Sequence, residues 1–159
     1  MLFRSLATTT AKATSYTTVA DGNNWSASAS WTPGTATNGV GPAQGDTVTI
    51  LHNTTVDVNS ACGASGATGT AALTIANTAD NKTLTIAPGV TLSLYGNLAH
   101  GTVYQHVSCV ALGAGSQIVF KPTTTAQYYW TFNYNSWITA AGSVGAHAQI
   151  RTEIGRAHV

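Results

Sequence analysis

A run of aromatic side chains is the part of this sequence best suited to binding chemistry. Residues 127–137, QYYWTFNYNSW, contain six aromatic residues. On a strand, Tyr128, Trp130, Phe132 and Tyr134 point to one face, because successive side chains alternate. Aromatic rings stack on the C–H faces of sugars, so Tyr128, Trp130, Tyr134 and Trp137 are candidate glycan-stacking residues, with a polysaccharide or cell-surface glycan as partner. The alternative is that the row fills the core, since such rings bury a large apolar area.

Trp25 and Trp31 raise the same two alternatives near the other end of the chain. They flank a short stretch of small residues in NNWSASASWTPG. If the fold is a solenoid, its open end exposes apolar core and needs a cap. We expect Trp25 and Trp31 to belong to such a cap rather than to a glycan site.

The acidic residues do not form the pair that polysaccharide hydrolysis requires. Glycosidases generally use two carboxylates at a defined separation, whereas the aspartates stand in four separate turns or strands, at Asp21, Asp46, Asp57 and Asp80. Asp46 follows a glycine at a strand entrance, which favours an Asx-turn, and Asp57 is expected on a solvated strand face. No Asp-x-Asp cluster indicates calcium, so we predict no metal site and no cofactor.

The histidines and serines also lack a catalytic arrangement. The native histidines form no His-x-His or His-Glu-x-x-His motif and are expected at the surface or packed, at His52, His100, His106 and His147. No Gly-x-Ser-x-Gly turn marks a nucleophilic serine. We assign no catalytic residue, and whether the whole protein is an enzyme stays open.

Threonine recurs in Thr-x-Thr and Thr-x-Ser motifs that begin at Thr47, Thr83 and Thr91. A flat threonine array on a β-solenoid can match the surface of ice. The steps between these motifs are 36 and 8 residues, which is not one repeat length. The ordinary interpretation is therefore solvent-facing threonine on strands.

Cys62 and Cys109 are the only two cysteines of the sequence. Their separation of 47 positions fits no metal-ligand spacing. Two alternatives stay open for them. One is a disulfide, which would stabilise the fold by about 4 kcal/mol in the loop-entropy treatment; the other is two separately buried free thiols.

The composition excludes several classes of protein. Charged residues make up 7% of the chain, and the formal net charge is +1. Because nucleic-acid-binding domains normally carry a basic patch, no nucleic-acid partner is expected. No apolar run approaches the ~20 residues of a membrane span. The length suits one domain with its own core, and the abundance of Thr, Ser, Asn and Gly favours an extracellular location or a cell or virion surface.

The pattern of apolar residues predicts short strands joined by tight corners. In GDTVTI, Val48 and Ile50 alternate with Thr47 and Thr49, and the same period of two recurs in TTVDV, ALTIA and KTLTIAPGVTLSLYGNL. Short corners and aliphatic inward positions are expected when the sides of one coil stack on the coil before. We predict an all-β fold, a right-handed parallel β-helix (solenoid), with a β-sandwich as the alternative.

The order of these motifs resembles a known family. From about Trp25 to Phe120, NNWSASASWTPG, GVGPAQGDTVTI, TTVDV, LTI and VTLSLYGNL are similar to the eight-glycine domain that opens some extracellular β-helix proteins. The shared features are a tryptophan pair, a Pro-x-x-Gly-Asp turn into a strand, and a later Gly-Asn-Leu. The resemblance implies an N-terminal β-helix region of a large secreted or surface protein. Some animal members are associated with hyaluronan binding or breakdown, but the resemblance assigns no catalytic residue here.

The two ends of the chain differ in composition from the rest. Back-translated, MLFRS and EIGRAHV match one short-read sequencing adapter in opposite orientations. We therefore interpret residues 1–5 and 153–159 as adapter-derived and exclude them from fold reasoning. Residues 6–45 are predicted to form a polar segment and solenoid cap, and residues 46–152 to form β-helix coils that are cut before their end.

These features together predict a structural or adhesive protein. We expect the N-terminal part of a secreted or surface-displayed β-helix protein that contacts glycans. The alternative is the N-terminal scaffold of a polysaccharide-degrading β-helix enzyme whose active site lies outside this chain. The sequence does not fix the oligomeric state.

Overall fold

The computed structural model describes residues 13–34, 41–64, 69–76, 82–100, 108–122, 126–132 and 136–153. Within them the chain is almost entirely β-structure, with one short 3-10 helix, η1 (Ser28–Ser30). The strands are β1 (Ser15–Thr18), β2 (Asn23–Asn24), β3 (Trp31–Thr32), β4 (Thr47–Ile50), β5 (Thr54–Val56), β6 (Ser60–Cys62), β7 (Ala71–Ile75), β8 (Lys82–Ile86), β9 (Thr91–Leu94), β10 (Asn97–His100), β11 (Ser108–Leu112), β12 (Gln117–Phe120), β13 (Trp130–Thr131), β14 (Ser136–Ala140), β15 (Gly142–Ser143), β16 (Ala146–His147) and β17 (Gln149–Thr152).

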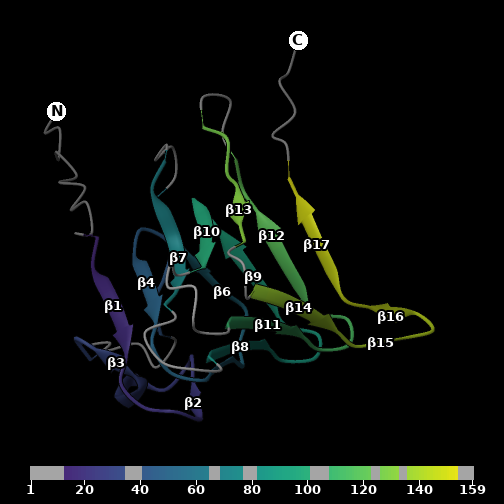
Figure 1. Ribbon diagram of the computed structural model, residues 1–159, viewed down its shortest axis with the longest axis horizontal. Coiled ribbons are helices and arrows are strands. Elements are labelled where there is room, and N and C mark those ends of the chain that lie inside the picture. The colour runs from purple at the N-terminus through teal and green to yellow at the C-terminus, as the bar shows by residue number, and fades with distance from the viewer. Residues whose placement is uncertain are drawn as a thin grey trace, which may run out of the picture.

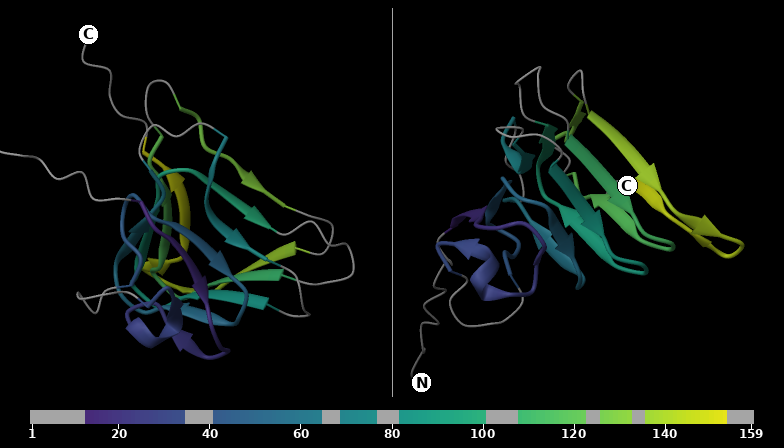
Figure 2. Two further views of the ribbon diagram at one scale, coloured as in Figure 1. Left: turned by 90° about the vertical axis from the view of Figure 1, so that its left-hand side faces the viewer. Right: turned by 60° about the horizontal axis from the view of Figure 1, so that its bottom comes forward.

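Three parallel sheets wind around one core, so the fold is a β-solenoid (Figure 1). Sheet A has the order β13-β10-β7-β4-β1-β3, sheet B the order β14-β11-β8-β5-β2, and sheet C the order β17-β12-β9-β6. Coil 1 contributes β1 and β2; coils 2 to 5 are β4-β5-β6, β7-β8-β9, β10-β11-β12 and β13-β14-β17. The coils follow one another from the purple to the yellow end (Figure 2). The predicted parallel β-helix is confirmed, and the sandwich alternative is wrong.

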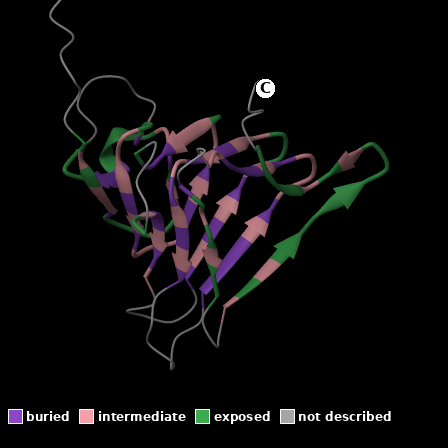
Figure 3. Cartoon of the chain, turned by 90° about the horizontal axis from the view of Figure 1, so that it is seen from above, coloured by how far each residue is buried: buried purple, intermediate pink, exposed green. Residues whose placement is uncertain are grey.

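The period of two in the sequence places aliphatic side chains inside the coils. In β4, Val48 and Ile50 are buried, whereas the alternate threonines are half-buried on the outside. Strand pairing aligns Val48 with Leu73 and Leu73 with Leu98, so each inward residue stacks on its equivalent in the next coil. Buried and partly exposed residues alternate along the inner strands (Figure 3). Each fully buried aliphatic side chain stabilises the fold by about 1.5–3 kcal/mol.

Successive coils have unequal lengths, which explains why the sequence shows no strict repeat. One coil runs from Val48 to Leu73, and a longer one from Ile118 to Ile150. The longer coil contains the antiparallel hairpin β15–β16, which projects from the body of the solenoid (Figure 1). The corners absorb the difference in length, so the strands still stack in register.

Parallel pairing begins before residue 46, inside the segment assigned to the cap. β1 pairs with β4, aligning Tyr16 with Val48, and β2 pairs with β5. β3 then pairs antiparallel with β1 and ends sheet A on the N-terminal side. Of the two predicted adapter segments, residues 1–5 and 154–159 lie outside the described residues, and Glu153 is described.

Candidate functional site

Trp25 and Trp31 lie inside the N-terminal end of the core. Their exposed fractions are 0% and 3%, and their rings meet edge to face with centroids 5.0 Å apart. The indole N–H of Trp31 donates to the carbonyl oxygen of Trp25, and that of Trp25 donates to the carbonyl oxygen of Pro42. Both rings are therefore enclosed with their polar groups satisfied, and neither offers a face to a sugar.

Two of the aspartates join segments of neighbouring coils. Asp57 accepts hydrogen bonds from the backbone N–H and the hydroxyl of Ser26. Asp46 accepts from the N–H groups of Thr14 and Ala43, and its own N–H donates to the carbonyl of Ala43, which closes a turn over residues 43–46. The carboxylate thus binds back to Ala43, whereas in the predicted Asx-turn it would bind the residue two positions on. The expectation that Asp57 is only solvated is wrong, because Ser26 lies against its carboxylate.

Asp21 connects coils 1, 2 and 3. Its Oδ1 accepts from the N–H of Asn53 at 2.7 Å and from the ammonium of Lys82 at 3.3 Å, with His52 Nδ1 3.7 Å away. The hydrogen bond from Asn53 is the main cause of the lowered pKa of Asp21, and Lys82 adds to it. A carboxylate held ionised in this way is a poor proton donor at neutral pH, so Asp21 acts as a connector.

Asparagine amides make the same connection farther along the chain. Each side-chain oxygen accepts a backbone N–H at or beside the start of a strand one coil later. The pairs are Asn53 with Thr83, Asn59 with Thr91, and Asn97 with Tyr129. This role was not predicted from the sequence. Asn and Asp at strand entrances were the signal for it, but the partner of each can be identified only once the length of each coil is known.

An aromatic cluster lies at the C-terminal end of sheet A. The rings of Trp130 and Phe132 stack with centroids 4.9 Å apart, and His100 stacks on Phe132 at 5.3 Å. Trp130 aligns with Leu98, so it lies on the inner side of the strand, and Tyr128 also packs against the core. Trp130 and Tyr128 therefore follow the core alternative rather than forming a solvent-facing row.

His100, which is 5% exposed, is the centre of a hydrogen-bond network between coils 4 and 5. Because an indole N–H can only donate, Trp130 Nε1 donates to His100 Nε2, at 3.0 Å. Nδ1 of His100 therefore carries the proton and donates to Ser108 Oγ at 2.6 Å, which lies 3.1 Å from Ser136 Oγ. Burial lowers the pKa of His100 to about 4, so the ring is neutral at pH 7.

His100 and Ser108 do not form a pair of general base and nucleophile. A general base must accept the proton of the serine, whereas His100 presents an N–H to Ser108. Ser108 is also completely buried, so no substrate reaches its hydroxyl. Of the other histidines, His52 lies beside Asp21, His147 is exposed on β16, and His106 lies outside the described residues.

Of the predicted glycan-stacking residues that the structure describes, Trp137 lies apart from Tyr128 and Trp130. Tyr128 and Trp130 face the interior, and Tyr134 lies outside the described residues. Trp137 is 48% exposed on the outer side of β14, because its neighbour Ile138 packs against the core. Tyr129, 58% exposed, was not among the predicted residues, yet it lies on the outer side because it alternates with Trp130.

Cys62 and Cys109 are free thiols, so the disulfide alternative is wrong. Cys62 lies on β6 of sheet C, and Cys109 lies on β11 of sheet B, two coils away. Neighbouring strands are about 4.8 Å apart, so two coils exceed the Cα separation of about 4.4–6.8 Å that a disulfide spans. Burial raises the pKa of Cys62, with a smaller contribution from Asp46, which makes this thiol unreactive.

The three threonine motifs lie on three different sheets and form no common array. Thr47 begins β4, Thr83 lies on β8, and Thr91 begins β9. Strand pairing instead aligns other threonines in outward columns, Thr17–Thr49–Thr74 on sheet A and Thr55–Thr85 on sheet B. Alanine interrupts both columns in coil 4, at Ala99 and Ala111. The outer faces are therefore rich in hydroxyl groups but not regular.

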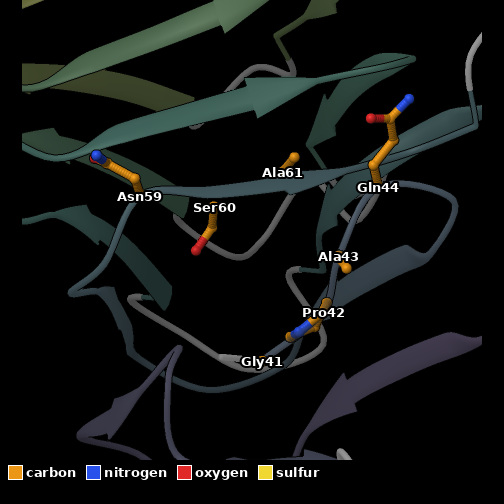
Figure 4. A pocket seen from close by; sticks show the side chains of 7 residues that line it. All are labelled: Gly41, Pro42, Ala43, Gln44, Asn59, Ser60 and Ala61. Carbon is orange, nitrogen blue, oxygen red and sulfur yellow. The ribbon is translucent and has the colours of Figure 1, made fainter. Parts of the chain in front are cut away.

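A hollow of about 280 Å³ lies between the segments that lead into β4 and β6 (Figure 4). Its lining is Gly41, Pro42, Ala43, Gln44, Asn59, Ser60 and Ala61. None of these residues is ionisable. Asn59 accepts the N–H of Thr91, and the Ser60 hydroxyl donates to the carbonyl of Val58. The hollow therefore offers no acid–base pair.

Comparison of the chain with protein-family models, with curated proteins and with solved structures finds no match. Among the described residues, no group of three or more His, Cys, Asp or Glu side chains is placed to hold a metal ion. In the part of the chain that the structure describes, no helix is long and apolar enough to cross a membrane.

Proposed function

We propose that this chain is the N-terminal part of a longer β-helix protein, secreted or displayed on a cell or virion surface, with a structural or adhesive role. The observation that carries the proposal is the difference between the two ends of the solenoid. Trp25 and Trp31 close the first coil and are almost fully buried. At the other end, Phe132 and Ile150 are 47% and 46% exposed.

The last described coil has the features of a coil on which a further coil can stack. β13, β14 and β17 stand at the ends of sheets A, B and C, and an edge strand presents N–H and C=O groups to which a further strand can bind. The inward positions of these strands carry apolar side chains, among them Trp130, Ile138 and Ile150. A sixth coil would bury them, as coil 4 is buried by coil 5.

Three further features support the proposal. Asp21, Asp46 and Asp57 each bind a backbone N–H of another segment, so their carboxylates have structural partners. The low charge and hydroxyl-rich outer faces suit an extracellular protein. The eight-glycine resemblance agrees with an N-terminal position in a longer β-helix protein. A polysaccharide-degrading enzyme with its active site in later coils is the alternative.

Long-read sequencing of the source DNA across both ends tests the proposal. We expect the reading frame to continue beyond Thr152 with more segments of alternating apolar residues separated by turn residues. A frame that stops within a few codons of Thr152 would overturn the proposal. A frame that contains MLFRS and EIGRAHV intact would refute the adapter interpretation of the two ends. Clustered Asp, Glu, Lys and Arg on one face of the later coils would favour the enzyme instead.

A further inference from the structure

The outer face of sheet B carries mostly small side chains in coils 3 to 5. Three columns of outward residues run along it and, from coil 5 to coil 3, they are Trp137–Cys109–Thr83, Thr139–Ala111–Thr85 and Ala141–Gly113–Ala87. The first column begins with an indole, and the second carries two hydroxyl groups. The third carries nothing larger than a methyl group. A ligand can therefore lie beside the indole without meeting another large side chain of these columns.

Trp137 is the one large side chain among these residues, and it pairs with Cys109 on the neighbouring strand. Trp137 is 48% exposed, while Cys109 on the neighbouring strand β11 is only 7% exposed. Thr139 on the same strand is exposed, and its hydroxyl lies 4.0 Å from Cys109 Sγ. A half-exposed indole with hydroxyl groups beside it matches the two faces of a sugar, which presents C–H groups to a ring and hydroxyls to polar partners.

The three columns contain no charged side chain. Lys82 begins β8, the strand that supplies Thr83 and Thr85, but it is 8% exposed and its ammonium group binds Asp21. A polymer with carboxylate or sulfate groups would find no counter-charge here, so electrostatic complementarity favours a neutral ligand. This selectivity differs from what the eight-glycine resemblance implies, since hyaluronan is anionic.

We propose that this face, the sheet B platform (Trp137, Thr139, Thr85 and the small residues between them), binds a neutral polysaccharide. The indole of Trp137 stacks on a sugar ring, and Thr139 and Thr85 hydrogen-bond its hydroxyl groups. The inference rests on the proposed structural role, because it gives a β-helix body a glycan to contact. The platform needs no sixth coil, however, so a failure of glycan binding and a failure of chain continuation are separate results.

Titration of the full chain with defined oligosaccharides tests the platform. The neutral probes are cellohexaose, laminarihexaose, xylohexaose and mannohexaose, and the anionic probes are hyaluronan and polygalacturonate oligosaccharides. Isothermal titration and tryptophan fluorescence measure binding. We expect at least one neutral probe to bind and both anionic probes to bind more weakly. Absence of binding by every neutral probe, or binding of an anionic probe alone, overturns the proposal.

Matched variants locate the site. Trp137→Ala is expected to weaken binding about tenfold or more, as for a central stacking residue, and Thr139→Val to weaken it about two- to fivefold. Tyr129→Ala is the control, because Tyr129 is also an exposed ring beside a coil 5 strand but belongs to sheet A. Circular dichroism checks that each variant is folded. Loss of binding in Tyr129→Ala with none in Trp137→Ala would place the glycan elsewhere and overturn the assignment.

Discussion

The two ends of the solenoid both carry aromatic clusters, but the clusters differ in what they cover. At the N-terminal end, Trp25 and Trp31 are enclosed, and their indole N–H groups bind carbonyl oxygens of the same end. At the C-terminal end, Trp130 stacks with Phe132 and His100, and Phe132 stays 47% exposed. Ring type alone therefore does not distinguish a cap from an open face; what differs is that the indole N–H groups of Trp25 and Trp31 are bound and their rings are enclosed.

The largest expected effect compares the two clusters directly. Trp25→Ala removes a completely buried ring and leaves a cavity, so we expect a loss of about 3–5 kcal/mol in the free energy of unfolding. Phe132→Ala removes a half-exposed ring and should cost about 1 kcal/mol. Urea unfolding followed by far-ultraviolet circular dichroism measures both losses without relying on tryptophan fluorescence.

A second variant tests the cluster of Trp25 and Trp31 without removing either ring. Gly41 has φ +74°, and a Cβ there would lie 2.1 Å from the carbonyl oxygen of Trp25. Gly41→Ala should therefore destabilise the protein in the same direction as Trp25→Ala. Equal losses of unfolding free energy for Trp25→Ala and Phe132→Ala would contradict the inferred difference between an enclosed and an open end.

The second effect is the acid sensitivity of the joint between coils 4 and 5. The folded pKa of His100 is about 4, below the ordinary value of about 6.5. The unfolded chain therefore binds a proton at this residue between these pH values while the folded chain does not. The contribution of neutral His100 to the free energy of unfolding is fully present above pH 6.5. It is lost as the pH falls to 4, which lowers the free energy of unfolding by about 3 kcal/mol. Protonation of His100 would also put a hydrogen on Nε2, and this N–H would face the indole N–H of Trp130.

Urea unfolding at several pH values from 7 to 4 checks this dependence. His100→Gln is the matched variant, because an amide can accept from Trp130 and donate to Ser108 without titrating in this range. The wild type should lose stability more steeply than the variant as the pH falls. Parallel curves for the two proteins would show that His100 does not set the acid sensitivity, and that other groups do.

Local alternation made the fold predictable, but it could not supply the contacts between coils. Val48 and Ile50 alternate with threonines, and that pattern alone indicates a strand with one buried face. In the aromatic run the same rule places Tyr128 and Trp130 on one face of the strand and Tyr129 on the other, and the structure confirms this. Alternation alone does not say which of the two faces lies inside. Because β13 and β14 belong to different sheets, the packing of Trp130 on the core and the exposure of Trp137 depend on how the coils stack.

The connections of His100 and the aspartates were also beyond the sequence, for a related reason. His100 meets Trp130, and Asp57 meets Ser26, only after coils of different length have stacked. No fixed period relates these positions, and a single hydrogen bond leaves no periodic signal. Sequence analysis could therefore exclude local catalytic motifs but could not assign the residues that link the coils.

The smallest effect compares two buried hydroxyl groups, one toward each end. Thr18, 2% exposed, accepts hydrogen bonds from the N–H groups of Leu51 and His52 at 2.9 and 3.1 Å. Ser116 is completely buried, and its hydroxyl has no partner among the described residues. Thr18→Val leaves two N–H groups unsatisfied and should cost about 1–3 kcal/mol.

Ser116→Ala removes a hydroxyl that makes no hydrogen bond, so desolvation of that group no longer opposes folding. We expect stability to stay within about 0.5 kcal/mol of the wild type or to rise by about 1 kcal/mol. The same urea titration measures both substitutions, with Thr18→Val as the reference for a hydroxyl that has partners. A loss above about 1 kcal/mol in Ser116→Ala would mean that an ordered water or another group binds this hydroxyl, and that the C-terminal half is as fully satisfied as the N-terminal end.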